Sequence, residues 1–143
     1  MKKEELRIGN YVTHKPYGNR DGEQVKIAGM LGMQAYFNKN TNEGGMFHNL
    51  YGIPLTPSIL EKAGFEKKEY AYTEYKKWVG ETGFSFEYRI RKGIKEPIIE
   101  FVLYGNGGYD DAGEMSIFET CKYVHQLQNL YFALTGTELE INI

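Results

Sequence analysis

The fold is decided by the stretch YVHQLQNLYFALTG at residues 123–136, which carries the longest helical pattern in the chain. Its large apolar side chains recur at the three- and four-residue spacing that lines one side of a helix. They are Tyr123, Leu127, Leu130 and Leu134, with Val124 and Tyr131 beside them. We expect Thr120 to cap the amino end and Gly136 to end the helix in the left-handed conformation. The pattern predicts a helix that anchors a core.

The opposite face of this helix combines polar side chains with one aromatic ring. On a helical wheel Phe132 falls beside His125, and Gln128 and Asn129 lie on the same side. An aromatic ring on a polar face predicts a second contact, made either by another part of this chain or by a partner protein. We therefore take His125, Gln128, Asn129 and Phe132 as the candidate partner surface.

Short strand patterns fill the chain before this helix. In residues 1–55, four or five of them are separated by turn residues, with a chain reversal expected at 29–32. Such closely spaced strands favour a small bent β-barrel of the SH3-like kind. Thr56 and Pro57 then begin a short helix that Gly64 ends. We place a boundary here, between a barrel lobe at residues 1–55 and an α+β lobe at residues 56–143, packed as one compact unit.

The second lobe is expected to hold an antiparallel sheet. Apolar and polar residues alternate from Phe84 to Arg91, which predicts a strand with one buried face and one wet face. Residues 97–104 suit a central strand, and the alternation in residues 138–143 suits an edge strand. The fold class expected is α+β, with the SH3-like barrel followed by an antiparallel sheet packed on the C-terminal helix.

Composition favours a cytoplasmic protein with no membrane segment. The chain is 41% hydrophobic and 25% charged, as ordinary globular proteins are. No apolar run approaches the ~20 residues of a membrane span. The lysines at the start are not followed by the apolar stretch of a secretory signal. Cys121 is the only cysteine, so an internal disulfide is excluded and a reduced compartment is expected.

The charge is distributed unevenly, which bears on nucleic-acid binding. Residues 97–143 hold seven acidic groups and one basic group, and such a segment disfavours contact with phosphate backbones. The candidate nucleic-acid face lies earlier and combines Arg89 and Arg91 with Lys77 and Tyr75, because cations neutralise phosphates and rings stack on bases. Glutamates lie among these residues, so a mixed, solvated sheet face is the other interpretation.

One acidic loop could hold a divalent cation through oxygen ligands. Its carboxylates are Asp110, Asp111, Glu114 and Glu119. Their spacing differs from that of the twelve-residue calcium loop, so a solvated acidic turn is the alternative.

Histidine and cysteine complete no catalytic or metal signature. His14, His48 and His125 fit no metal-ligand spacing. Cys121 and His125 are four residues apart, as a nucleophile and its base on one helix would be, but no third group orients the base. A structural cysteine is the alternative. We expect no catalytic residue, no metal and no cofactor.

Three segments carry a resemblance to a known family. They are LRIGNYV at 6–12, IPLTPSILEKAGF at 53–65 and YVHQLQNLYFALTGTEL at 123–139. In them the sequence resembles a family of short uncharacterised proteins from anaerobic gut bacteria and from their phages and mobile elements. The resemblance implies a small intracellular protein with stereotyped ends and a variable centre. It implies no activity, cofactor or catalytic residue.

The leading functional hypothesis is a non-enzymatic module that binds a protein partner, as an adaptor does. The alternative is nucleic-acid binding by the face that contains Arg89. The third hypothesis is a metal-dependent enzyme that uses the acidic loop.

Overall fold

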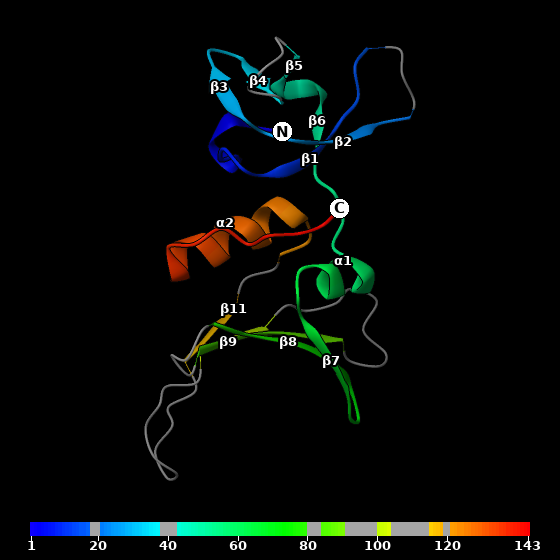
Figure 1. Cartoon of the computed structure of the whole chain (residues 1–143), viewed down its shortest axis with the longest axis vertical. Coiled ribbons are helices and arrows are strands. Elements are labelled where there is room, and N and C mark those ends of the chain that lie inside the picture. The colour runs from blue at the N-terminus through cyan, green and yellow to red at the C-terminus, as the bar shows by residue number, and fades with distance from the viewer. Residues whose placement is uncertain (18–20, 38–42, 80–83, 91–99, 104–114, 119–120) are drawn as a thin grey trace. The chain divides into compact units, whose positions relative to one another are not determined.

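The computed structural model describes residues 1–17, 21–37, 43–79, 84–90, 100–103, 115–118 and 121–143, and at residues 84, 90, 100–103 and 115–118 it describes the backbone alone. Helices and antiparallel strands make up the described elements, so the predicted α+β class is confirmed (Figure 1). The chain divides into two compact units. The N-terminal unit contains Met1–Leu55, Lys122–Leu139 and Ile143, and the central unit contains Thr56–Cys121 and Glu140–Asn142.

The N-terminal unit holds two antiparallel sheets of three short strands each, in the orders β2-β1-β6 and β3-β4-β5. The strands are β1 (Tyr11–His14), β2 (Glu23–Lys26), β3 (Gly29–Leu31), β4 (Gln34–Tyr36), β5 (Gly44–Met46) and β6 (Leu50–Tyr51). Two short 3-10 helices, η1 (Lys3–Glu5) and η2 (Phe47–Asn49), accompany them. The two sheets are separate ladders, so no closed barrel is found among the described strands.

The reversal between β3 and β4 occurs at Gly32. This glycine has a φ of +58°, a left-handed conformation that costs glycine little because it lacks a Cβ. Gly29, by contrast, is a strand residue paired with Tyr36. The reversal predicted over residues 29–32 was therefore placed too early, because glycines mark both the strand and the turn.

Apolar side chains from these strands share one core. Val12 and Leu50 are completely buried, and Ile27 is almost so. The buried members of the cluster are Leu6, Val12, Ile27, Ala35, Phe47 and Leu50. Burying each larger side chain contributes about 1.5–3 kcal/mol, so this cluster fixes the positions of the surrounding strands.

The long helix α2 (Val124–Thr135) belongs to the N-terminal unit, where it lies against β1 (Figure 1). The sequence-based division had assigned it to the second lobe. Its N-cap residue is Tyr123, and the Gln126 side chain accepts hydrogen bonds from the backbone N–H groups of Lys122 and Tyr123 at 2.8 and 3.1 Å. Thr120, the predicted cap, lies outside the described residues. Gly136 ends the helix with a φ of +71°, as expected.

The central unit begins with α1 (Pro57–Lys62), whose cap was predicted correctly. The Thr56 hydroxyl accepts a hydrogen bond from the Ile59 N–H at 3.3 Å, and Gly64 follows the helix with a φ of +81°. A three-stranded antiparallel sheet comes next, in the order β7-β8-β9. Its strands are β7 (Glu66–Glu69), β8 (Thr73–Val79) and β9 (Phe84–Ile90).

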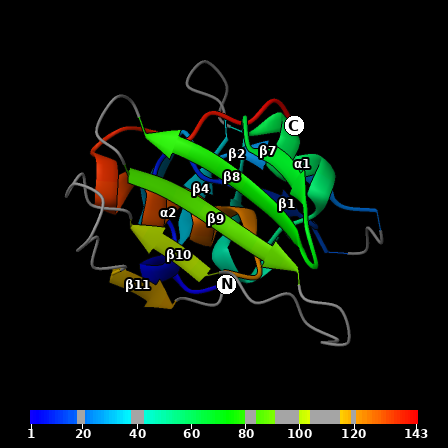
Figure 2. The same ribbon diagram turned by 90° about the horizontal axis from the view of Figure 1, so that it is seen from below.

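Two further strands, β10 (Glu100–Leu103) and β11 (Met115–Phe118), pair with each other. Figure 2 shows β10 beside β9. Residues 138–143 contain no strand, so the predicted edge strand is wrong. None of the helices in the described segments combines the length and apolar character that a bilayer crossing needs.

Candidate functional site

Polar side chains of α2 form hydrogen bonds with the N-terminal segment of the same chain. The Gln128 side chain accepts a hydrogen bond from the Tyr11 N–H at 2.9 Å and donates one to the Gly9 carbonyl at 3.2 Å. The Asn129 side chain accepts from the Asn10 amide at 2.9 Å and donates to a backbone carbonyl of η1 at 2.9 Å. These two side chains therefore hold the N-terminal segment against the helix.

The other two residues of the candidate partner surface differ in exposure. His125 is buried, whereas Phe132 keeps 37% of its surface exposed. The guanidinium of Arg7 lies 3.7 Å from the centre of the Phe132 ring and also pairs with Glu138. The second contact that the sequence demanded of Phe132 is thus made by the same chain. The sequence does not display this contact, because Arg7 and Phe132 are far apart along the chain.

The candidate nucleic-acid residues do not share one face of the sheet. Tyr75 pairs with Tyr88 across the strands, whereas Arg89 pairs with Glu74. Cross-strand partners lie on the same face and successive residues alternate. Tyr75 and Lys77 therefore lie on one face and Arg89 on the other. Tyr75 is also buried, and Arg91 lies outside the described residues.

Lys77 supports the end of α1. Its Nζ donates a hydrogen bond to the Ala63 carbonyl at 2.8 Å, which suits a cation at a helix carboxyl end. Burial lowers the pKa of Lys77, because desolvation disfavours the charged form. This lysine is therefore engaged within the central unit.

The face with Arg89 contains a buried carboxylate that the sequence placed in solvent. Glu87 is 1% exposed, and it pairs with Lys76 Nζ at 2.8 Å and with the Arg89 guanidinium at 2.6 Å. Burial by itself raises the pKa of Glu87, but the hydrogen bonds and charges of Lys76 and Arg89 outweigh burial and hold it below its ordinary value. The wet-face prediction is wrong for Glu87. No local pattern indicates this burial, because Lys76 becomes the cross-strand partner of Glu87 only through the register of β8 and β9.

The acidic loop and Cys121 were the other candidates for metal binding or catalysis. The acidic loop lies outside the described residues, so the structure does not test it as a cation site. Its carboxylates are Asp110, Asp111, Glu114 and Glu119. Within the described segments, no group of three or more His, Cys, Asp or Glu side chains is arranged to hold a metal ion. Cys121 is buried.

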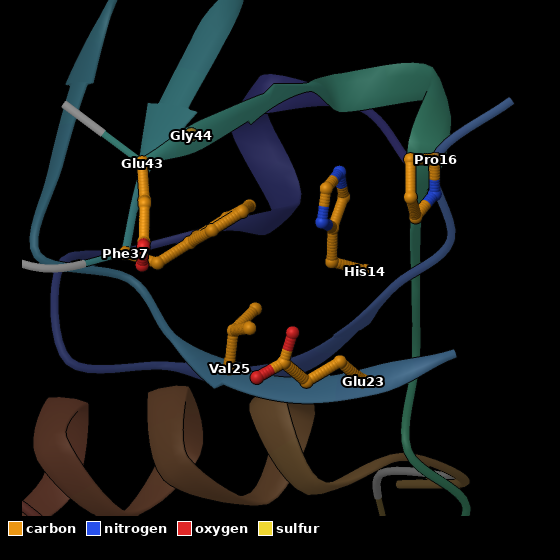
Figure 3. Close-up of a pocket in the computed structure, with 7 residues that line it drawn as sticks. All are labelled: His14, Pro16, Glu23, Val25, Phe37, Glu43 and Gly44. Atoms are coloured by element: carbon orange, nitrogen blue, oxygen red, sulfur yellow. The ribbon is translucent and has the colours of Figure 1, made fainter. Parts of the chain in front are cut away.

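A cavity of about 280 Å³ lies in the N-terminal unit beside β1 and β2 (Figure 3). It combines rings, carboxylates and aliphatic groups. Its side chains are His14, Phe37, Glu23, Glu43, Val25 and Pro16. Figure 3 shows the rings of His14 and Phe37 on two sides of the space, with Glu23 and Val25 below them.

Local pairing positions these side chains. His14 and Glu23 are direct partners in the β1–β2 ladder, so their side chains project from the same face. The His14 and Phe37 ring centres are 4.8 Å apart with a tilt of 51°. The Phe37 N–H donates a hydrogen bond to the Glu43 carbonyl at 3.0 Å, which brings the second carboxylate to the cavity. A Cβ at Gly45 would lie 2.4 Å from His14 Nε2, so glycine makes room for the imidazole.

The lining determines which ligands suit this cavity. It contains two carboxylates, and none of the described lining residues is lysine or arginine. Aromatic faces attract cations, and aliphatic surface accommodates a methylene stem. The cavity therefore suits a cationic head on an apolar stem, which describes a lysine or arginine side chain.

The comparisons with known proteins give no independent assignment. No protein-family model, curated protein or solved structure matches this chain. The chemistry of the cavity beside His14 is therefore the basis for assigning a function.

Proposed function

We propose that the protein is a non-enzymatic, protein-binding module of the adaptor type, and that its His14 cavity receives a basic side chain of the partner protein. The observation that carries this proposal is the convergence of Glu23 and Glu43 with the rings of His14 and Phe37 around one open space. The carboxylates complement a positive charge, and the rings supply a face for the same cation.

The architecture of the N-terminal unit is compatible with this role. We propose that its short strands are a bent, SH3-like arrangement, supported by two three-stranded antiparallel sheets within Met1–Leu55. A cytoplasmic location is proposed with it, because Cys121 is the only cysteine of the sequence and an internal disulfide is excluded. An origin in a phage or mobile element is proposed from the resemblance alone.

The proposal is tested by comparing probes that differ only in charge. Acetyl-lysine amide, acetyl-arginine amide and the uncharged acetyl-norleucine amide are titrated into the full chain and followed by backbone amide NMR. We expect saturable shifts at residues 14, 23 and 37 with the two cationic probes, and weaker binding as salt increases. Equal responses to lysine and norleucine probes would contradict a site that recognises charge.

The ring contribution is tested by Phe37→Leu, which keeps an apolar side chain but removes the aromatic face. We expect the lysine probe to bind about two- to fivefold more weakly, because an exposed cation–π contact is worth about 0.5–1 kcal/mol. Tyr36→Leu is the matched control on the neighbouring position, because Tyr36 does not line the cavity. An equal loss of affinity in both variants would show that the substitutions disturb the fold and that the Phe37 ring does not bind the cation.

A further inference from the structure

The strand β2 forms one edge of its sheet, because among the described strands it pairs with β1 alone. A strand at the edge of a sheet presents a row of N–H and C=O groups that can pair with a further strand. Three of the four residues of β2, namely Glu23, Gln24 and Lys26, are exposed. The edge of β2 is therefore accessible to an added strand.

The hydrogen bonds of the β1–β2 ladder determine which backbone groups of β2 point outward. Directly after the strand, the Ile27 N–H donates a hydrogen bond to the Asn10 carbonyl at 2.9 Å. Along an antiparallel strand, residues alternate between those that bond the partner strand and those that do not. Val25 is two residues before Ile27 and therefore bonds β1, whereas the backbone groups of Gln24 and Lys26 point away from β1. No hydrogen bond joins these outward groups to any of the described residues.

The same strand forms part of the His14 cavity, which Glu23 and Val25 line. Figure 3 shows their side chains below the rings of His14 and Phe37. In an added strand, a residue opposite Val25 would lie on the same face, with its Cβ about 5 Å from that of Val25. A lysine or arginine at that position would carry its charge along a flexible stem toward the carboxylates of Glu23 and Glu43. One extended segment can therefore occupy both the edge and the cavity.

We propose that the outer edge of β2 binds an extended segment of the partner protein as an added strand, with a lysine or arginine of that segment in the His14 cavity. This inference rests on the proposed function and adds the mode of recognition. Main-chain hydrogen bonds align the segment, and the cavity selects the basic side chain. The β2 strand of a second copy does not supply that side chain, because its Lys26 would lie on the face opposite to the cavity. The partner segment carries its basic residue between extended neighbours.

The experiment compares acetyl-Thr-Thr-Lys-Thr-Thr amide with two N-methylated forms of this peptide, by NMR titration of the full chain. Methylation of the second and fourth backbone nitrogens removes the N–H groups that face β2 when the lysine enters the cavity. Methylation of the third and fifth nitrogens removes N–H groups that face away, which makes this form the matched control. We expect the first form to bind about three- to tenfold more weakly than the other two peptides. Equal affinities of the two methylated forms would overturn the strand addition.

Acetyl-lysine amide separates this inference from the proposed function. It carries the basic side chain but is too short to span the outward groups of Gln24 and Lys26. If acetyl-lysine amide binds and the pentapeptide binds no more tightly, the cavity recognises the cation and the strand addition is wrong. If neither probe binds, the proposed function is wrong and the strand addition is overturned with it.

A variant of β2 tests the edge from the side of the protein. Gln24→Pro removes an outward N–H without removing a hydrogen bond to β1, and proline is tolerated on edge strands. We expect the pentapeptide to bind this variant about three- to tenfold more weakly, while acetyl-lysine amide binds it as it binds the wild type, because Gln24 does not line the cavity. In the wild type, the pentapeptide should also slow hydrogen exchange of the Lys26 amide. An undiminished affinity for Gln24→Pro, or unchanged exchange at Lys26, would overturn the proposal.

Discussion

The polar face of α2 and the polar face of β9 satisfy their buried groups by different means. On α2, neutral amides bind backbone groups, as Gln128 does with Gly9 and Tyr11. On β9, a carboxylate is matched by two cations, as Glu87 is with Lys76 and Arg89. Burying an amide costs far less than burying a charge. A polar stripe in the sequence is therefore not evidence of solvent exposure. Because only one of the two faces buries a charge, the two units also depend on pH differently.

The largest effect is expected where two part-buried cations lose the carboxylate that they share. Glu87→Ala leaves Lys76 and Arg89 without their common carboxylate, and we expect a loss of about 3–5 kcal/mol in the free energy of unfolding. Urea unfolding measures it. Glu69→Gln is the matched control, because its pairing with Lys67 is exposed to solvent and should contribute little. Similar losses in both variants would show that Glu87 is not buried as described.

The second-largest loss of stability is expected on removing the side-chain amide of Gln128 in α2. Gln128→Ala leaves the Tyr11 N–H and the Gly9 carbonyl without their partner, and we expect a loss of about 2–3 kcal/mol in unfolding free energy. The exposed glutamine of β2 provides the control, and Gln24→Ala should change stability by no more than about 0.5 kcal/mol. If Gln128→Ala behaved like Gln24→Ala, the N-terminal segment would not be held by this helix.

Acid should destabilise the two faces in separate pH windows. The pKa of His125 is lowered from 6.5 in the folded protein, so its contribution is complete above about pH 6.5 and is lost as pH falls through the folded value. The pKa of Glu87 is lowered from 4.5, so its contribution is lost only as pH falls below about 4.5. Urea unfolding at pH 7.5, 5.5 and 4 in wild type and His125→Gln should show that the variant lacks only the first loss. A variant with the wild-type profile would contradict this assignment.

The smallest effect is expected at the exposed ring of α2. Arg7→Gln removes the cation from the Phe132 ring and from Glu138, and we expect a loss of about 0.5–1 kcal/mol. Phe132→Leu should cause a smaller decrease in Tm, because the pairing of Arg7 with Glu138 remains, and the double variant should lose no more than Arg7→Gln alone. Additive losses would instead show that Arg7 and Phe132 act independently.

Local signals in the sequence were sufficient for several elements. The cap at Thr56 predicts the start of α1, and the glycines after both helices predict where α1 and α2 end. The alternation of apolar and polar residues predicts β9. The α+β class follows from these elements. These features depend on neighbouring residues, which a sequence displays directly.

The burial of polar side chains and the cavity beside His14 could not be predicted from neighbouring residues. The partners of Gln128 lie near residue 10, and the cavity joins His14 with Phe37 and Glu43. A helical wheel places a glutamine on the solvent-facing side, because the wheel contains no information about distant backbone groups. It therefore does not show which of these groups will bind the glutamine. The same applies to Glu87, whose burial depends on the register between β8 and β9.

The double variant Glu23→Gln/Glu43→Gln tests whether these two carboxylates recognise a basic side chain. Both changes keep the shape of the side chain and remove its charge. The affinity for acetyl-lysine amide, measured by NMR titration, should fall about tenfold, while the exposed control Glu61→Gln leaves it unchanged. An affinity in the double variant equal to that of the wild type would show that the two carboxylates do not bind the cation.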